Sequence, residues 1–376
     1  MPSTLDTDQR DTGAGVITTG GNLIADVLGA IPLLSIRDLT IEYRTAGRTV
    51  ELVKSASFEI GRGEIVCLVG ESGSGKTITA RAIMGLHREQ GRLKASGVIE
   101  FMGEDLIPAS EARHRDLRGR ELGMIFQDPT AALDPVMTIG KQIREAVSRR
   151  QLTRSETDRR ILELIHQVGI SDPEHRVRQY PHEISGGMCQ RVSIAIALAG
   201  DPMLLIADEP TTALDVTIQS QVLELLKSLR GDRGMSVLLV THDMGVAAQT
   251  ANRIVVMYAG SIVEFGTTRE FFDRPGHPYS LGLIKAVPRI GTERLDRLST
   301  IPGSVPEPRD RPPGCSFHPR CPIAIDRCRV EVPMMTRVGS RAVACHRAAE
   351  VLSGELEVWS PPKAGSPDQS NWEFEA

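Results

Sequence analysis

The sequence predicts an α/β fold with a parallel central sheet, and two stretches carry this prediction. Residues 64–77 pass from the apolar run Ile65–Val69 through a glycine-rich turn into a helix-like stretch. Residues 203–210 begin with a second continuous apolar run, which is typical of a strand buried on both faces of a parallel sheet. At 376 residues the chain is long enough for one large domain or two ordinary ones.

The glycine-rich turn matches the pattern strand, Gly-x-x-x-x-Gly-Lys-Ser/Thr, helix of a phosphate-binding loop. Its glycines let the backbone curl so that successive N–H groups point at phosphate oxygens, and the helix N-terminus adds positive charge. Lys76 is expected to reach the β- and γ-phosphates, and the Thr77 hydroxyl to hold Mg²⁺. The other loop residues expected around the phosphates are Gly70, Ser72, Gly73, Ser74 and Gly75. The sequence therefore predicts a nucleotide site.

Composition argues against two other classes of protein. The formal net charge is -4, so no overall positive field favours nucleic acid as a partner. No apolar run reaches about 18 residues, so no membrane-spanning helix is expected. The stretch 16–34 contains polar residues and lacks a basic leader, so it is not predicted to be a signal peptide. We expect the chain to stay in the cytosol and to reach any membrane through a partner.

Elements on either side of the loop follow the same α/β pattern. Residues 34–43 nearly alternate between apolar and polar, which predicts a strand. Tyr43 near its end is either an adenine-stacking ring or a half-buried strand aromatic. A helix is expected at about 75–87, and short strands near 98–101 and 122–126.

Two further motifs lie in the middle of the chain. Gln127 ends a strand and opens a turn, after which residues 138–168 have a helical pattern. Ser185, Gly186 and Gly187 stand at the start of an apolar helix, where unpaired N–H groups offer an anion site. A plain serine N-cap is the alternative interpretation.

Polar side chains follow two buried strands. Asp208 and Glu209 end the apolar run 203–210, and ligands of parallel sheets bind at the carboxyl ends of strands. Asp208 is expected to hold Mg²⁺ through its water shell, leaving Glu209 to orient and polarise a water. His242 follows a buried strand at 236–240 and either contacts a γ-phosphate or is a structural histidine.

In this order, Tyr43, the loop 70–77, Gln127, the Ser185 motif, the Asp208-Glu209 pair and His242 resemble the complete motif set of an ABC-type ATPase. Asp215, which ends an Ala-Leu-Asp triplet, is similar to a further family motif. The resemblance covers about residues 33–290. It implies a P-loop NTPase domain of the ABC type, with a RecA-like core, an antiparallel β subdomain and a helical subdomain.

The resemblance also implies roles. Tyr43 would stack on adenine, while Lys76 and the loop amides would bind phosphates. Three residues would serve Mg²⁺: Thr77, Gln127 and Asp208. Three would act in catalysis: Gln127, Glu209 as the catalytic carboxylate and His242 at the γ-phosphate. Four more would belong to nucleotide sites: Ser185, Gly186, Gly187 and Asp215. Of these, Ser185 and Gly187 would act on the ATP of a second subunit.

The C-terminal third carries four of the six cysteines, at Cys315, Cys321, Cys328 and Cys345. Disulfides are unexpected in a reducing cytosol, so clustered thiols predict a metal or cluster site. Four thiolates suit either a 4Fe–4S cluster or a structural zinc ion, and the spacing chooses neither. Independent structural thiols are the alternative.

The stretch Gly276-His-Pro-Tyr to Val287 and the cysteine segment resemble the C-terminal extension of ATPases that drive dipeptide and oligopeptide import. This resemblance favours the 4Fe–4S cluster. Four segments are expected: a flexible extension at 1–32, the ATPase domain at 33–266 with its helical subdomain at about 128–200, a small loop-rich C-terminal domain at 267–352 with the cysteine site, and a disordered tail at 353–376.

These resemblances imply the ATP-hydrolysing subunit of an ABC importer for dipeptides or oligopeptides. Its expected partners are two transmembrane permeases, a second homologous ATPase in a heterodimer and an extracytoplasmic substrate-binding protein. It would work at the cytoplasmic face of the membrane. The alternative is an ABC ATPase acting in DNA repair or translation, against which the single ATPase module and the acidic balance count.

Overall fold

The structure is a computed structural model. It describes residues 31–45, 47–88, 91–148, 150, 152–212, 215–287, 300–356 and 358–359. The N-terminal extension expected at 1–32 therefore lies outside the described residues, apart from its last two positions.

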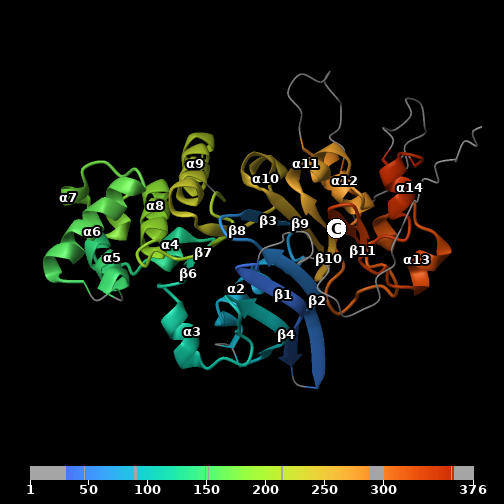
Figure 1. The fold of residues 1–376 in the computed structure, drawn as a ribbon, viewed down its shortest axis with the longest axis horizontal. Coiled ribbons are helices and arrows are strands. Elements are labelled where there is room, and N and C mark those ends of the chain that lie inside the picture. Colours follow the sequence, from blue (N-terminus) through green and yellow to red (C-terminus); the bar gives the residue numbers. More distant parts are fainter. Residues whose placement is uncertain are drawn as a thin grey trace, which may run out of the picture.

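The core of the molecule is an eight-stranded sheet with the order β11-β12-β10-β9-β3-β8-β7-β6 (Figure 1). Its strands are β3 (Ile65–Val69), β6 (Leu122–Ile125), β7 (Leu204–Asp208), β8 (Ser236–Thr241), β9 (Arg253–Tyr258), β10 (Ser261–Thr267), β11 (Thr336–Val338) and β12 (Arg341–Val343). The pairs β3–β8, β3–β9, β7–β8 and β6–β7 are all parallel. Every residue of β3, β7, β8 and β9 is buried, as the continuous apolar runs predict. The predicted α/β class is confirmed.

A second, antiparallel sheet has the order β2-β1-β4-β5. Its strands are β1 (Leu34–Thr45), β2 (Arg48–Ile60), β4 (Leu93–Phe101) and β5 (Glu104–Asp105). Figure 1 shows β1, β2 and β4 beside helix α2 (Lys76–Ile83), below the central sheet in this view. The short turn η1 (Leu86–Arg88) and helix α3 (Glu111–Leu117) complete this part. β1 and β4 match the strands expected near 34–43 and 98–101.

A group of helices follows β6 and lies at the far end of the molecule from the C-terminal region (Figure 1). It contains α4 (Pro129–Ala132), α5 (Ile139–Ser148), α6 (Arg154–Gln167), α7 (Pro173–Arg176), η2 (Pro181–Glu183) and α8 (Gly186–Ala197). α6 begins with a capping box in which Thr153 and Glu156 satisfy each other's backbone N–H groups. These helices fall within the range expected for the helical subdomain, whose limits stay a prediction.

The other helices surround the central sheet and its C-terminal extension. They are α9 (Val216–Arg233), α10 (Met244–Thr250), α11 (Thr268–Asp273), α12 (Pro278–Lys285), η3 (His318–Arg320), α13 (Asp326–Val330) and α14 (Ala348–Ser353). In the part of the chain that the structure describes, no helix has both the length and the apolar character needed to cross a membrane.

The C-terminal region is built onto the central sheet rather than standing apart from it. β12 pairs antiparallel with β10, so the hairpin β11–β12 extends the central sheet. Phe317, Tyr258 and Tyr279 belong to one buried apolar cluster. At the end of the described chain, Trp359 donates from Nε1 to the Pro278 carbonyl at 2.9 Å. Most of the tail expected at 353–376 lies outside the described residues.

Candidate functional site

The phosphate-binding loop joins β3 to α2 and is packed against the end of β9. A Cβ at Gly70 (φ 155°) would lie 2.2 Å from the Met257 carbonyl oxygen, and one at Gly75 (φ 106°) would lie 2.8 Å from the Met257 methyl. The Ser74 carbonyl accepts the backbone N–H of Gly260 at 2.8 Å. The loop therefore needs glycine at these two positions, both for backbone conformation and for space.

Lys76 begins α2, and its side chain is folded into the loop. Its Nζ donates to the carbonyl oxygens of Gly70 at 2.8 Å and Glu71 at 2.9 Å. Burial lowers the pKa of Lys76, and the carboxylates of Glu209 and Asp208 offset part of that effect. An anion bound in the loop would favour the charged ammonium in the same way.

Thr77 and Asp208 meet at the carboxyl ends of β3 and β7. The Thr77 hydroxyl donates to Asp208 Oδ1 at 3.0 Å, and Asp208 is only 1% exposed. Burial raises the pKa of Asp208, and the hydrogen bond from Thr77 counteracts it. A hydroxyl and a carboxylate oxygen are ligands that suit Mg²⁺, so these residues fit the expected ion.

Glu209 is the centre of a polar network. Its Oε2 accepts from Gln127 Nε2 at 3.2 Å and from the Thr212 hydroxyl at 3.0 Å, while its Oε1 lies 3.2 Å from His242 Nδ1. The structure thus brings together the three residues expected in catalysis. The sequence analysis did not predict a role for Thr212. The signal that could have indicated one is its position three residues after Glu209, in the turn that follows the strand.

The Glu209 backbone is itself unusual. It has φ 48°, a left-handed conformation that is uncommon for a residue with a side chain. Its N–H donates to the Val240 carbonyl at 2.9 Å, which fixes the start of the turn against β8. Strained backbone of this kind occurs at functional sites, because the surrounding structure must hold it in place.

The remaining expected site residues lie elsewhere. Ser185 caps α8 by accepting from the Met188 N–H, and Asp215 caps α9 by accepting from the Ile218 N–H. The Tyr43 hydroxyl accepts from Arg92 at 3.3 Å. In the described residues no hydrogen bond joins Ser185, Asp215 or Tyr43 to the phosphate loop.

The start of α8 is open to a further molecule. A Cβ at Gly186 would meet nothing within 4 Å, and one at Gly187 would meet only the Ile218 side chain, at 3.6 Å. The free N–H groups of this helix start, next to the start of α9, therefore have room for a ligand that the same chain does not supply.

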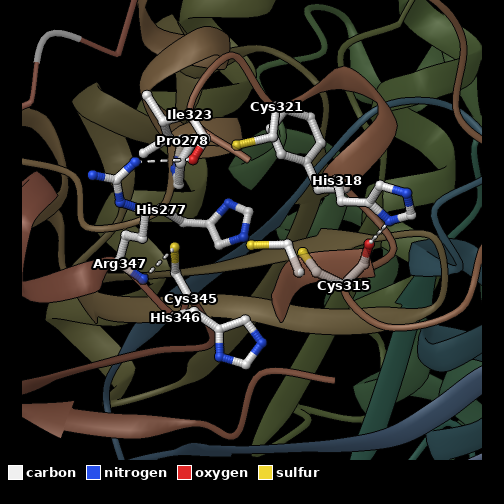
Figure 2. Close-up of a pocket in the computed structure, with 11 residues that line it drawn as sticks. His277, Pro278, Cys315, His318, Cys321, Ile323, Cys345, His346 and Arg347 are labelled. Atoms are coloured by element: carbon white, nitrogen blue, oxygen red, sulfur yellow. Dashed lines mark hydrogen bonds between the residues drawn. The ribbon is translucent and has the colours of Figure 1, made fainter. Parts of the chain in front are cut away.

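All four C-terminal cysteines line one pocket of about 310 Å³, part of it open to solvent. Figure 2 shows Cys315, Cys321 and Cys345 around the same space as the His277 ring. His318, which also lines the pocket, donates from Nδ1 to the Cys315 carbonyl oxygen at 3.0 Å. The remaining lining residues are Pro278, Phe317, Ile323, Cys328, His346 and Arg347.

Burial makes three of these thiols unfavourable as thiolates. It is the largest cause that raises the pKa of Cys315, that of Cys321 to about 11 and that of Cys345 to about 12, and repulsion from neighbouring cysteines contributes to the same shifts. A soft cationic group would reverse this effect, so the donor chemistry fits a thiolate-bound metal. In the described chain, however, no three such side chains already stand close enough together to hold a metal ion.

Two family models match the sequence. The ABC transporter model matches residues 53–212, and the model described as "Oligopeptide/dipeptide transporter, C-terminal region" matches residues 263–328. The dipeptide transport ATP-binding protein DppD of Escherichia coli is 46% identical over 316 residues, which cover 84% of this chain and 96% of DppD. The oligopeptide transport ATP-binding protein AppD of Bacillus subtilis is 46% identical over 315 residues, which cover 83% of this chain and 96% of AppD.

Solved structures give the same result. The ATP-binding cassette MJ0796, in a dimeric post-hydrolysis state bound to ADP and phosphate, superposes with a TM-score of 0.57 at 27% identity. The match covers 63% of this chain and 99% of MJ0796.

Fold and site together define a P-loop ATPase with an ABC-type nucleotide-binding domain. The chain belongs to the ABC transporter family, in the group of transport ATP-binding proteins that carry the oligopeptide/dipeptide C-terminal region. The predicted family and the predicted ATPase activity are confirmed.

Proposed function

We propose that this protein hydrolyses ATP to power uptake of dipeptides or oligopeptides through two membrane-spanning permeases. The observation that carries the proposal is the Glu209 network, in which Gln127 and His242 meet the carboxylate beside the phosphate loop. The names of DppD and AppD support the class of cargo. They favour an importer over the alternative of an ATPase in DNA repair or translation.

The proposed chemistry uses the sheet edge. The loop amides and Lys76 would bind the phosphates, and Thr77, Gln127 and Asp208 would hold Mg²⁺. Glu209 would accept a proton from the attacking water as the water oxygen bonds to the γ-phosphorus. The bond from that phosphorus to the bridging oxygen breaks in the same step, and ADP leaves. Gln127 and His242 hold the Glu209 carboxylate at the correct angle, and His242 also contacts the γ-phosphate.

We propose further that two ATPase subunits pair to complete the sites. The described part of the chain carries one phosphate loop and one open helix start at Ser185-Gly186-Gly187, which supports action of that helix start on the ATP of a partner subunit. Asp215, next to it, and Tyr43, on the adenine side, complete the proposed nucleotide contacts. The partner would be a homologous ATPase in a heterodimer, and the dimeric state of MJ0796 supports such pairing.

The contact with the permeases is proposed near Gln127 and residues 128–143, because this segment joins the catalytic edge to the helices at the far end of the molecule. Energy from nucleotide binding would pass to the membrane there. The protein would then work at the cytoplasmic face of the membrane, and an extracytoplasmic substrate-binding protein would deliver cargo to the permeases from the other side.

For the cysteine pocket we propose a 4Fe–4S cluster, with zinc as the alternative. Its ligands would be Cys315, Cys321, Cys328 and Cys345, and their shared pocket supports the assignment. The group would supply four metal–thiolate bonds that tie together a loop-rich region. Metal analysis of the purified chain distinguishes the two: iron with acid-labile sulfide favours the cluster, and one zinc ion per chain favours zinc.

Purification of the tagged protein in mild detergent, followed by mass spectrometry of its partners, tests the transport function. We expect two polytopic permeases and a second ATPase. A co-purifying binding protein, offered candidate peptides, would identify the cargo. Ribosomal or DNA-repair partners without a membrane protein would overturn the proposal.

A further inference from the structure

Two side chains from the C-terminal region bind Glu71, the second residue of the phosphate loop. Arg320 forms a two-pronged ion pair with its carboxylate: Nη1 to Oε2 at 2.7 Å and Nη2 to Oε1 at 2.9 Å. The Glu71 backbone N–H donates to the Tyr279 hydroxyl at 2.8 Å. Both the side chain and the backbone of one loop residue are therefore fixed from segments more than 200 positions away in the sequence.

These supporting side chains are themselves rigid. The Arg320 side chain is 5% exposed, and its Nε donates to the Pro302 carbonyl at 2.9 Å. Its guanidinium carbon lies 5.8 Å from the centre of the Tyr258 ring and 6.0 Å from that of Phe317. Burial alone would lower the pKa of Arg320, but the hydrogen bonds to Glu71 and Tyr258 outweigh it and raise the pKa. A buried, planar fork of this kind fixes its partner carboxylate in one orientation.

Glu71 in turn supports the catalytic end of the loop. Its carbonyl oxygen accepts from Lys76 Nζ at 2.9 Å and from the Ser74 N–H at 3.2 Å. A shift of Glu71 would therefore displace the Lys76 ammonium and the Ser74 N–H, because both donate to the Glu71 carbonyl. Both groups are proposed to contact phosphate.

We propose that Arg320 and Tyr279 are positioning residues for the nucleotide site: by holding Glu71, they keep the phosphate loop in its binding conformation and so set the affinity for the nucleotide phosphates. The inference rests on the proposed nucleotide site. It gives the C-terminal region a direct part in ATP use, in addition to any metal that it holds.

The same support is continuous with the cysteine pocket. Cys321 directly follows Arg320, and the Tyr279 N–H donates to His277 Nδ1 at 3.0 Å, inside the pocket lining. Phe317 lines the pocket and also faces Arg320. The positions of Arg320 and Tyr279 therefore depend on how the residues that line the cysteine pocket pack.

Calorimetric titration of the full-length chain with Mg-ADP tests the proposal, because ADP binds the loop without being hydrolysed. We expect Arg320→Ala and Glu71→Gln to weaken binding on the order of tenfold with an unchanged number of sites per chain. Arg320→Lys should recover part of the affinity, since it restores the charge but not the fork. Tyr279→Phe, which removes one hydroxyl, should cost about threefold.

The matched control is Arg327→Ala, which breaks a comparable but exposed ion pair with Glu331 in the same region. It should leave ADP binding unchanged. A purely structural role predicts fewer sites and a lower melting temperature with unaltered affinity, and that result would overturn the proposal. Equal weakening by Arg327→Ala would also overturn it.

A second reference separates this inference from the function that it rests on. Lys76→Ala should abolish ADP binding. If Lys76→Ala binds normally, the proposed nucleotide site is wrong. If Lys76→Ala fails to bind while Glu71→Gln and Tyr279→Phe bind like the unaltered chain, the site stands and the positioning role is wrong. These two conservative variants keep the test valid should Arg320→Ala fail to fold.

Discussion

The nucleotide site and the cysteine pocket are assembled in opposite ways. The nucleotide site draws on strand ends from residue 70 to residue 242, yet its polar groups already pair with one another: Thr77 with Asp208, and Glu209 with Gln127 and His242. The cysteine pocket takes its four thiols from residues 315–345, yet burial raises the pKa of three of them, Cys315, Cys321 and Cys345, and among the described residues no three side chains stand ready to hold a metal ion. A parallel sheet preorganises the first site, whereas the second would gain stability from the bound group that we propose.

This difference predicts different consequences of mutation. In the nucleotide site a single substitution should remove chemistry and leave the fold intact, since the sheet holds the other groups in place. In the cysteine pocket a single substitution should remove the bound group and with it local stability.

The largest expected effect is that of Glu209→Gln. An amide cannot accept the proton of the attacking water, so turnover should fall by about 10²–10⁴-fold while ATP binding persists. Phosphate release and calorimetric titration measure the two quantities. The control is Glu331→Gln, which changes an exposed carboxylate in the C-terminal region and should leave turnover unchanged. Undiminished turnover in Glu209→Gln would remove the proposed catalytic carboxylate.

Cys321→Ala tests the other half of the comparison. We expect loss of the bound metal and a melting temperature lower by roughly 5 °C, because the pocket loses a metal–thiolate bond. Cys67→Ala is the matched control: Cys67 is a buried thiol in β3, outside the pocket, and metal content should persist. Elemental analysis measures the metal content of each variant, and thermal unfolding measures its melting temperature. A metal-free unaltered chain, purified without oxygen, would contradict the proposed cluster.

Thr77→Ala should raise the Mg²⁺ concentration for half-maximal turnover about tenfold, since it removes both a proposed ligand and the hydrogen bond that orients Asp208. Thr77→Ser keeps the hydroxyl and should stay near the unaltered value. Titration of ATPase activity with Mg²⁺ measures the effect, and identical curves for the alanine and serine variants would show that the hydroxyl does not serve the ion.

The smallest effect is expected at Tyr43. Stacking on a base is worth about 1 kcal/mol, so Tyr43→Ala should weaken ATP binding about fivefold and Tyr43→Phe hardly at all. Competition between ATP and inorganic triphosphate, which lacks the base, isolates the adenine contact. If Tyr43→Ala weakens the binding of ATP and the binding of triphosphate by the same factor, Tyr43 does not contact the base and is only a half-buried strand residue.

The sequence predicts the central sheet well because buried parallel strands carry continuous apolar runs: β3, β7 and β8 lie where these runs stand. β2 was not expected. Its first half contains exposed Arg48 and Lys54 and half-buried Glu51, and these charged residues hide its strand character. The hairpin β11–β12 was also missed, since each of its strands has three residues and too short a pattern to recognise.

The same contrast holds for the sites. The phosphate loop and the carboxylates after β7 could be recognised because short motifs place them, although their individual roles stay predictions. The ion pair between Arg320 and Glu71 could not be predicted, because the two residues lie 249 positions apart. No motif in the sequence links one of them to the other. Only tertiary packing brings such a pair together.

The pairing of β12 with β10 has a consequence for biosynthesis. β10 is made early, but its neighbour at Arg341–Val343 leaves the ribosome about 75 residues later, so one edge of the central sheet waits unpaired during translation. An open strand edge can recruit other chains and lead to aggregation. Truncation before residue 336 should therefore give insoluble protein even though every nucleotide-site motif is present. A segment synthesised late, β12, thus completes the sheet that β3 begins.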